Sequence, residues 1–482
     1  MSVLHKRGID ADTNMQKHIE RKLSECLLDD PVKSPALKWL RDNIFRVVND
    51  SSATSAESLH SEAANWLEWA RSKKDLKVVT VDVPDGILPT GATGRLHDVK
   101  VFARHGPDDA LYDSQPDLRE KVARGNCFLE VCQHKSDSTV ICVIHALKKF
   151  TGGLGDDDDR TSGPDFVWER YFTQPFDIAE AIVCTKKQNG EAAHLGVCRI
   201  GTEIYICAGS KNVHLLFRSS KDLDKYPLHE QRYQVANEVA RCILEMLDRL
   251  SENVRVYLLE FLCVTRSTAV FELLSPHHQH VEDLSELKAA ELKFIAWTSC
   301  CLQSTSSFCY LPPNSGIELA RIFELNTIEY SLISVGCLDE HMTDIRSRYG
   351  VEGEVLFFLD ANWRTVGMLK KKSVWYIIVR AIRQKVHAAC VSYSKNSEAF
   401  VQSTHVHKIE HRLKEIQQWL HLDDKTLLAW KHLAEKFLAF CIVQLRAQNF
   451  SASDFTDYFP VHWKNFLLQK EETDYISSTG KL

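Results

Sequence analysis

The sequence predicts an α+β protein, with a central body of strands and helices between two helical regions. Three observations lead to this prediction. In the first 75 residues, apolar residues recur at three- and four-residue spacing, as on one face of a helix. From about residue 76 to 385, short apolar runs rich in β-branched and aromatic residues are typical of strands. Helical spacing then returns, so we expect domains at 1–75, 76–385 and 386–482.

The elements are expected in the following order. The first region contains two helices, whose apolar faces are Leu37, Leu40, Ile44 and Val48 in one and Leu59, Ala63, Trp66, Leu67 and Ala70 in the other. In the central body, β-like runs lie at 77–83, 127–132, 140–146, 197–207, 254–264 and 354–359, with an amphipathic helix at 228–251. The last region forms helices at 409–420, 425–448 and 453–468.

Composition and charge exclude several classes of protein. The 482 residues include 59 Lys+Arg and 65 Asp+Glu, a net charge of −6, so any nucleic-acid contact must be a local basic patch. No stretch approaches the length of a membrane-spanning helix, and the first residues do not form the apolar segment of a secretory signal. The 15 cysteines form no Cys-x-x-Cys pair. We therefore expect an intracellular protein with reduced thiols, cytoplasmic or nuclear.

The first candidate for chemistry is Lys187, in the string Lys187-Gln188-Asn189-Gly190. It follows the β-like run 181–184, and Asn-Gly favours a tight turn that would present the amine into a pocket. Taken alone, the pattern is better explained by a hairpin turn with a surface lysine.

The second candidate is the string Lys370-Lys371-Lys372-Ser373-Val374-Trp375-Tyr376. In a strand, residues i and i+2 face the same side, so Lys370 and Lys372 would point two ammonium groups into one pocket. Such a pair suits a polyphosphate. Between residues 364 and 385 there are seven basic residues and no acidic one. A solvated basic edge is the alternative, but it leaves Trp375 and Tyr376 unexplained.

Two single glutamates complete the set. Glu272 lies in the apolar run 270–274, and Glu352 precedes the apolar run 355–359. A carboxylate among apolar residues must be paired, bind a ligand or face solvent. Each alone is more simply an ordinary strand residue. In the order Lys, Glu, Glu, Lys-x-Lys, the four elements indicate one shared site.

This order resembles the covalent nucleotidyltransferase superfamily of ATP-dependent ligases and capping enzymes. The matching elements are Lys187-x-Asn-Gly (motif I), Gly209-Ser210-Lys211-Asn212 (motif Ia), Phe271-Glu272 (motif III), Glu352-Gly353-x-Val355 (motif IV) and Lys370-x-Lys372 (motif V). The Lys-x-Lys-Ser-x-Trp-Tyr form is most similar to the T4 RNA ligase 1-like branch, which includes fungal and phage tRNA-repair ligases. The resemblance implies an ATP-grasp-like adenylyltransferase domain of antiparallel sheets and helices, followed by a helical domain that recognises RNA.

The resemblance covers roughly residues 120–385 and includes two upstream elements. Arg124-Gly125-x-x-Phe128 and Lys148-Lys149-Phe150 are similar to elements of the branch, and Arg170-Tyr171-Phe172 is an alternative to the second. The segment between Phe150 and Lys187 is longer than in the branch. It contains the run 156–159 of four aspartates, which we expect to be a solvated turn, because it has no alternating calcium-ligand spacing.

The resemblance also implies roles for single residues. Lys187 takes the nucleotide as a lysyl-adenylate, while Lys370 and Lys372 stabilise the transferring phosphate. Because an amine with a pKa of about 10.4 is almost fully protonated at neutral pH, we expect a metal ion and these lysines to lower the pKa of Lys187. Glu352 is expected to hold Mg²⁺, with Mn²⁺ as an alternative. The implied nucleotide contacts are Arg124, Lys148, Phe150, Asn189, Gly190, Lys211 and Glu272.

The predicted function is an ATP-dependent RNA ligase that joins 5′-phosphate and 3′-hydroxyl ends through a lysyl-adenylate and an RNA-adenylate. Structured RNA such as tRNA is the expected partner, and we expect a monomer with no membrane contact. One alternative is a catalytically inactive RNA-binding module of the same fold. Another is a capping-type guanylyltransferase or DNA ligase, which is disfavoured because helices and not the strands of an OB-fold are expected after Lys372.

Overall fold

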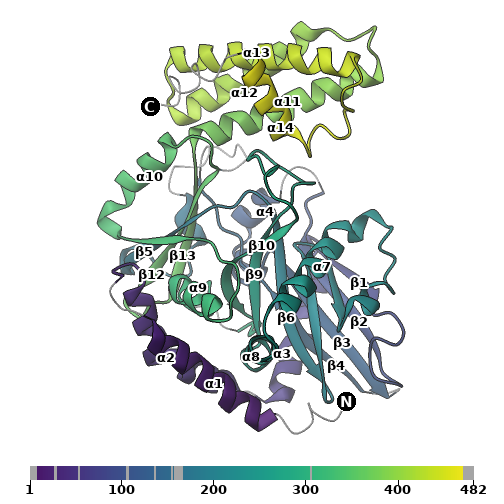
Figure 1. Cartoon of the computed structure of the whole chain (residues 1–482), viewed down its shortest axis with the longest axis vertical. Helices are drawn as coiled ribbons and strands as arrows, with labels where there is room; N and C mark the ends of the chain where they lie inside the picture. Colours follow the sequence, from purple (N-terminus) through teal and green to yellow (C-terminus); the bar gives the residue numbers. More distant parts are fainter. Residues whose placement is uncertain are drawn as a thin grey trace.

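The computed structural model describes residues 8–26, 30–52, 55–104, 108–134, 137–153, 156, 167–303 and 307–470. Three antiparallel sheets form the middle of the molecule, and a layer of helices from the last part of the chain lies at one end (Figure 1). The first two helices run along the outside of the sheets, away from that layer. The prediction of a mixed helix and antiparallel-sheet protein is confirmed.

The strands pair as follows. The first sheet has the order β1 (Leu76–Asp82), β2 (Thr93–Val101), β3 (Asn126–His134) and β4 (Asp137–His145). The second has the order β10 (Glu291–Ser299), β9 (Ser267–Leu274), β6 (Glu191–Ile200), β7 (Glu203–Ser210) and β8 (His214–Phe217). The third has the order β11 (Tyr330–Ser334), β5 (Ala179–Lys186), β12 (Gly353–Asp360) and β13 (Thr365–Lys372).

The helices fall into three groups along the chain. The first group is α1 (Gly8–Glu25), α2 (Ser34–Ser52) and α3 (Ala56–Ser72). Those among the strands are α4 (Asp109–Ser114), α5 (Pro116–Lys121), α6 (Ser220–Leu223), α7 (Gln234–Arg249), α8 (Glu252–Thr265), α9 (Pro313–Ile322) and α10 (Leu338–Ser347). The last group is α11 (Val374–Lys395), α12 (Gln402–Leu420), α13 (Asp424–Arg446) and α14 (Phe459–Lys470).

The strand expected at 254–264 is wrong, because this segment is helix α8. The helix packs against α1, α2 and the strands β6 and β9, so apolar residues cover most of its surface. A helix that is apolar on nearly all sides has no clear period, and its sequence cannot be told from that of a buried strand. The single run expected at 197–207 is a hairpin, since β6 and β7 turn at Gly201.

The final helical region begins earlier than expected. Helix α11 starts at Val374, directly after β13, so the expected boundary at 385/386 falls inside a helix. The side chain of Ser373 caps α11 by accepting a hydrogen bond from the backbone N–H of Tyr376 at 3.1 Å. The Lys-Ser-x-Trp-Tyr string therefore joins the end of a strand to the start of a helix.

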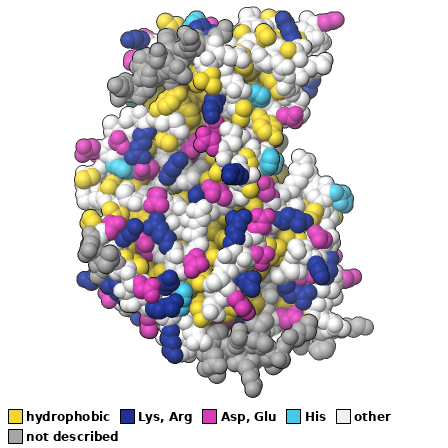
Figure 2. Space-filling view, viewed as in Figure 1, with side chains coloured by type: hydrophobic (Ala, Val, Ile, Leu, Met, Phe, Trp, Pro, Cys, Tyr) yellow, Lys and Arg dark blue, Asp and Glu magenta, His cyan; other side chains and the backbone are white. Residues whose placement is uncertain are grey.

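On the face shown in Figure 2, basic and acidic side chains are interspersed over the body, and neither kind forms a large patch. Within the described part of the chain, no helix is long and apolar enough to cross a lipid bilayer.

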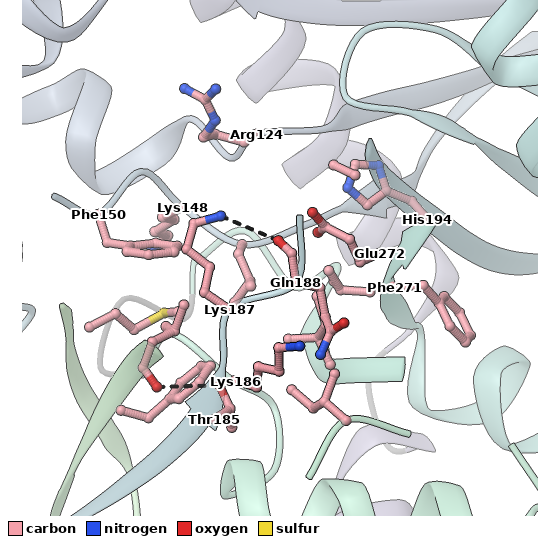
Figure 3. Close-up of a pocket in the computed structure, with 18 residues that line it drawn as sticks. Arg124, Lys148, Phe150, Thr185, Lys186, Lys187, Gln188, His194, Phe271 and Glu272 are labelled. Carbon is pink, nitrogen blue, oxygen red and sulfur yellow. Dashed lines mark hydrogen bonds between the residues drawn. The ribbon is translucent and has the colours of Figure 1, made fainter. Parts of the chain in front are cut away.

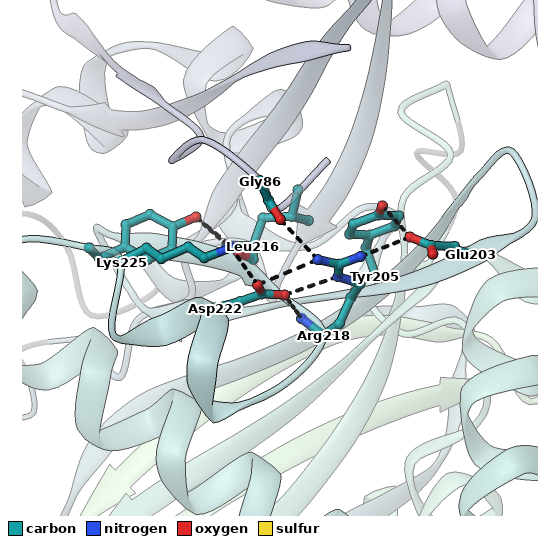
Figure 4. A network of polar contacts seen from close by, with 8 residues as sticks. Gly86, Glu203, Tyr205, Leu216, Arg218, Asp222 and Lys225 are labelled. Atoms are coloured by element: carbon teal, nitrogen blue, oxygen red, sulfur yellow. Dashed lines mark hydrogen bonds and ion pairs between the residues drawn. The ribbon is translucent and has the colours of Figure 1, made fainter. Parts of the chain in front are cut away.

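A polar network centred on Arg218 joins the loop after β1 to the second sheet (Figure 4). Arg218 donates from Nη1 to Glu203 at 2.9 Å and from Nε to Asp222 at 3.0 Å. It also donates from Nη2 to the carbonyl of Gly86 at 3.1 Å, and Tyr205 donates to Glu203 at 2.8 Å. The network holds this loop against β7 and the β8–α6 turn.

The final helices have their own core, with Phe437 at its centre. Its ring contacts five aromatic rings, those of Phe440, Phe455, Phe459, Trp463 and Phe466. These helices are therefore stabilised by contacts among themselves as well as by their junction with the sheets.

We expect Phe437→Ala to lower the free energy of unfolding by about 3–5 kcal/mol, because it leaves a cavity among these rings. Leu428→Ala, on the same helix but 66% exposed, should change it by less than about 0.5 kcal/mol. Denaturant unfolding followed by circular dichroism measures both. Equal stability of the two variants would contradict the assigned core.

Candidate active site

Two adjoining cavities meet at Lys187 and Arg124, the two residues among the predicted set that line both. One cavity is mostly apolar and is bounded by the second and third sheets (Figure 3). The other is open and cationic, and extends toward α11. The amine of Lys187 therefore lies where an apolar ligand group and a charged one would join.

The apolar cavity has a volume of about 160 Å³. Phe150, Lys148 and Glu272 line it together with apolar side chains from both sheets and from two loops. Those from the sheets are Ala192, Val270, Phe271, Ile295, Val355, Phe357 and Met368, and those from loops are Leu147 and Ile328. A flat aromatic heterocycle suits such walls. Phe172, the alternative to Phe150, lies instead in an aromatic cluster with Trp168 and Phe358.

The cationic cavity has a volume of about 490 Å³. Its basic side chains are Arg124, Lys149, Lys187, Lys370, Lys372, Arg380 and Arg383, and its acidic ones are Asp108, Asp109 and Glu352. Asn189, Gly190 and Tyr376 also line it. An excess of four positive charges over negative ones, seven against three, suits a polyanion such as a chain of phosphates.

Strand register brings the lysine elements together. Lys187 follows β5, and its backbone N–H donates to the carbonyl of Gly353 at 2.9 Å. β12 pairs with β5 on one side and with β13 on the other, and places Gly353 opposite Lys372. Because Lys370 and Lys372 are two residues apart on β13, both face the same cavity, as their spacing predicts.

Lys187 forms an ion pair with Glu352, with Nζ and Oε1 separated by 3.0 Å. Burial alone would lower the pKa of Lys187, but Glu352 and Glu272 raise it above its usual value. The expectation of a lowered pKa is therefore wrong for the protein without ligands. The reason is that two carboxylates lie closer to the amine than the sequence pattern could show.

The other charged groups of the site titrate unusually as well. Burial raises the pKa of Glu272 to about 7, although Lys187 opposes the shift. Burial, followed by Lys370, lowers the pKa of Lys372 to about 7. Burial would raise the pKa of Glu352, but Lys187 and Lys372 hold it below its usual value. Perturbed groups gathered around two adjoining cavities are typical of functional sites.

Asn189 connects several parts of the site through four hydrogen bonds. Its Nδ2 donates to Glu352 at 2.7 Å and to the Tyr376 hydroxyl at 3.1 Å, and its Oδ1 accepts from the N–H groups of Val281 and Glu282. It thus fixes the second carboxylate oxygen of Glu352 while Lys187 takes the first.

Two glycines of the motifs are required by close contacts. A Cβ on Gly190 would lie 2.1 Å from the carbonyl of Leu273, and the Gly190 N–H donates to Glu272 at 3.0 Å. Gly353 has a φ of +141°, and a Cβ there would lie 2.0 Å from the carbonyl of Lys371. Only glycine lets these backbones approach so closely.

The upstream cations are held by acidic residues at the mouth of the cationic cavity. Oδ2 of Asp108 lies 3.4 Å from Nη1 of Arg124 and 3.6 Å from Nζ of Lys211. Asp109 forms an ion pair with Lys149. Burial raises the pKa of Asp108, but Arg124 and Lys211 outweigh it and lower that pKa. Lys211 is not among the residues that line either cavity, and it pairs with Asp108, which lines the cationic one. Lys148 is buried, which lowers its pKa.

A divalent ion would find a suitable ligand in Glu352. This carboxylate faces the cationic cavity, and Mg²⁺ is commonly held by one or two carboxylates together with phosphate oxygens and water. The residues present therefore fit a metal that is bound jointly with a nucleotide.

Sequence reasoning missed several residues of the site. Arg380 and Arg383 belong to the acid-free stretch 364–385, so the charge pattern contained a signal for them. Asp108 and Asp109 had none, because only the folded chain places α4 beside Arg124 and Lys149.

No curated protein matches this chain. Similar solved structures include a point mutant of Naegleria gruberi RNA ligase with ATP and Mn, at 11% identity and a TM-score of 0.26 over 64% of this chain and 94% of that chain. Naegleria gruberi RNA ligase with PPi has 10% identity and a TM-score of 0.26, over 63% and 98%. The model of the family described as Domain of unknown function (DUF7920) matches residues 98–383, more than half of the chain, so the chain belongs to that family.

Proposed function

We propose that this protein is an ATP-dependent RNA ligase that acts through a lysyl-adenylate. The observation that carries the proposal is the position of Lys187 at the junction of an apolar and a cationic cavity. With an adenine in the first and phosphates in the second, the α-phosphorus would lie next to the Lys187 amine. The five motif residues Lys187, Glu272, Glu352, Lys370 and Lys372 are all present around these cavities.

In the first step, the Lys187 amine attacks the α-phosphorus of ATP. A P–N bond forms, the bond to the β-phosphate oxygen breaks, and pyrophosphate leaves. Lys370, Lys372 and Arg124 face the charge that develops on the phosphates. Glu272 lies on the apolar side, where its carboxylate can accept hydrogen bonds from the ribose hydroxyls.

Glu352 would hold the divalent ion, which supplies neutralisation of phosphate charge. Its second role is to position Lys187 before the nucleotide arrives, since the two are paired at 3.0 Å. Lys187 must give up its proton before it attacks. A cation bound to Glu352 would weaken the ion pair between this carboxylate and the Lys187 ammonium, and so would lower the pKa of Lys187.

In the second step, a 5′-phosphate oxygen of RNA attacks the adenylate phosphorus and releases Lys187. In the third step, a 3′-hydroxyl attacks the 5′-phosphate, and AMP leaves. Arg380 and Arg383 approach the cavity from α11, and we assign them to RNA phosphates. The final helices would then hold a structured RNA such as tRNA.

The alternatives have less support. A capping-type enzyme or DNA ligase would continue into OB-fold strands, but residues 374–470 form helices joined by loops and contain no strand. An inactive RNA-binding module would not be expected to keep the Lys187–Glu352 pair together with Lys370, Lys372 and Glu272.

Incubation with α-labelled ATP and a divalent ion should leave covalent label on the wild-type protein in a denaturing gel. Lys187→Ala and Lys187→Arg should abolish the label, because each variant lacks a nucleophilic amine at that position. Label from GTP alone would indicate capping-type chemistry. The absence of label with either nucleotide, from folded and nucleotide-free protein, would refute the ligase proposal.

Arg383→Gln should retain the lysyl-adenylate but transfer AMP to a 5′-phosphorylated RNA about 10–100 times more slowly, because one charged phosphate contact is lost. Single-turnover transfer from pre-labelled protein measures this. The control is Lys385→Gln, on the same helix but not in the cavity lining. Equal slowing of both variants would contradict the assignment.

The second-order rate constant for labelling should rise about tenfold per pH unit below pH 7, as Lys187 loses its proton. Because the pKa of Lys372 is about 7, its ammonium is present below that pH and lost above it, so the rise should level off near pH 7. Lys372→Arg keeps its charge and should remove the bend, whereas Glu272→Gln should keep it. A bend that disappears in Glu272→Gln would assign it to Glu272 instead.

A further inference from the structure

Asp156 is a buried carboxylate that belongs to neither cavity. It begins the acidic run 156–159, for which a solvated turn was expected, and its side chain is 0% exposed. That expectation is wrong for Asp156, while the other three aspartates lie outside the described residues. A buried carboxylate needs partners, and the partners of Asp156 identify what it does.

Asp156 and Arg346 together hold the backbone of Lys372. The guanidinium of Arg346, on α10, donates from Nη1 to Oδ1 at 2.8 Å and from Nη2 to Oδ2 at 2.7 Å. The backbone N–H of Lys372 donates to Oδ1 of Asp156 at 2.7 Å. Its carbonyl accepts from Nη1 of Arg346, also at 2.7 Å. Both polar groups of one peptide residue are thus taken by a single bidentate ion pair.

The location of Lys372 explains why such a clamp is needed. β13 is the edge strand of its sheet among the described residues, and Lys372 is its last residue, so none of the described strands pairs with its outer side there. Earlier along the same edge, the Lys370 N–H donates to the carbonyl of Thr151 at 3.3 Å. Two residues after Lys370, the side chain of Asp156 takes the place of a backbone carbonyl and accepts the hydrogen bond from the Lys372 N–H.

Phe150 and Thr151, which precede Asp156 in the chain, also lie at the site. Phe150 lines the apolar cavity, Thr151 bridges to Leu369 on β13, and Asp156 holds Lys372 in the cationic one. A displacement of Asp156 would therefore change the position of the Lys372 ammonium relative to a nucleotide bound against Phe150.

We propose that Asp156 and Arg346 are positioning residues for nucleotidyl transfer, which fix the Lys372 backbone so that its ammonium meets the transferring phosphate. The inference rests on the proposed function. Neither residue touches the nucleotide, and they act through Lys372. A purely structural ion pair would instead lower stability without a selective effect on the chemical step.

The test uses Asp156→Asn, which keeps the shape and one acceptor oxygen but removes the charge. We expect the labelling rate at saturating ATP to fall about 100-fold, because a misplacement of about 1 Å costs that much. The ATP concentration for half-saturation should change by less than about threefold, since the other nucleotide contacts remain. A change in half-saturation alone, or wild-type kinetics, would overturn the inference.

Arg348→Gln is the matched control. Arg348 lies just beyond the end of α10 and pairs with Asp344 and Glu354, but it makes no contact with the Lys372 backbone in the described structure. Its loss should lower the melting temperature while the saturated labelling rate stays within about threefold of wild type. If Arg348→Gln slows labelling as much as Asp156→Asn, a general loss of stability explains both and the inference fails.

The double variant Asp156→Asn/Arg346→Gln separates a shared role from two independent ones. If the residues act as one clamp, the double variant should label no more slowly than the slower single variant. Multiplied effects would overturn the proposed clamp.

Hydrogen exchange of the peptide spanning residues 365–376 gives a readout that needs no activity. Asp156→Asn should speed exchange of the Lys372 amide, because this N–H donates to the charged carboxylate of Asp156. Arg348→Gln should not, because Arg348 pairs with Asp344 and Glu354. Absence of label from the wild-type protein would refute the proposed function. In that case the role in nucleotidyl transfer falls with the function, and the exchange tests the backbone clamp by itself: unchanged protection in Asp156→Asn overturns the clamp as well.

Discussion

The ion pair between Lys187 and Glu352 is the constraint around which the site is built. The Glu352 side chain is only 3% exposed, so neither charge of the pair could be removed without leaving the other poorly compensated. The pair also sets the resting state, in which carboxylates raise the pKa of the nucleophile. In the proposed reaction, a cation held by Glu352 would take over part of the role of the ammonium. Activation of the Lys187 amine would then be linked to the arrival of metal and nucleotide.

The pair can form only because the third sheet aligns its strands. β12 lies between β5 and β13, so the residue after β5, the residue before β12 and the end of β13 meet at one edge. The close approach of Gly353 to Lys371 and of Gly190 to β9 lets these turns pack without side chains between them. The second sheet contributes Glu272 from β9, and the apolar cavity lies between the two sheets.

The features that the sequence predicts correctly are those that depend on residues close together in the chain. The alternation of Lys370 and Lys372 on one strand face depends on two-residue periodicity, and the Asn-Gly turn on local backbone preference. The sequence of helix α8 does not indicate a helix, because its surroundings are apolar on nearly all sides and its apolar residues therefore have no helical period. Asp156 could not be found, since the acidic run has no spacing that distinguishes a buried clamp from a solvated turn. Its role depends on Arg346, 190 residues away in the chain.

Lys372 is also where the sheets pass directly into the final helices. Ser373 caps α11 and its backbone N–H donates to the carbonyl of Glu352 at 2.9 Å, so the helix start is bound to the same residue that pairs with Lys187. Seven residues on from Ser373, Arg380 is close enough to oppose protonation of both Lys187 and Lys372. A continuous segment from β13 through α11 thus carries the lysines of the cationic cavity and the arginines that we assign to RNA. In a ligase built this way, the position of the RNA end relative to the adenylate is set by one strand-to-helix junction. That junction tolerates little movement, because backbone groups of Glu352, Lys372 and Ser373 all have fixed partners there.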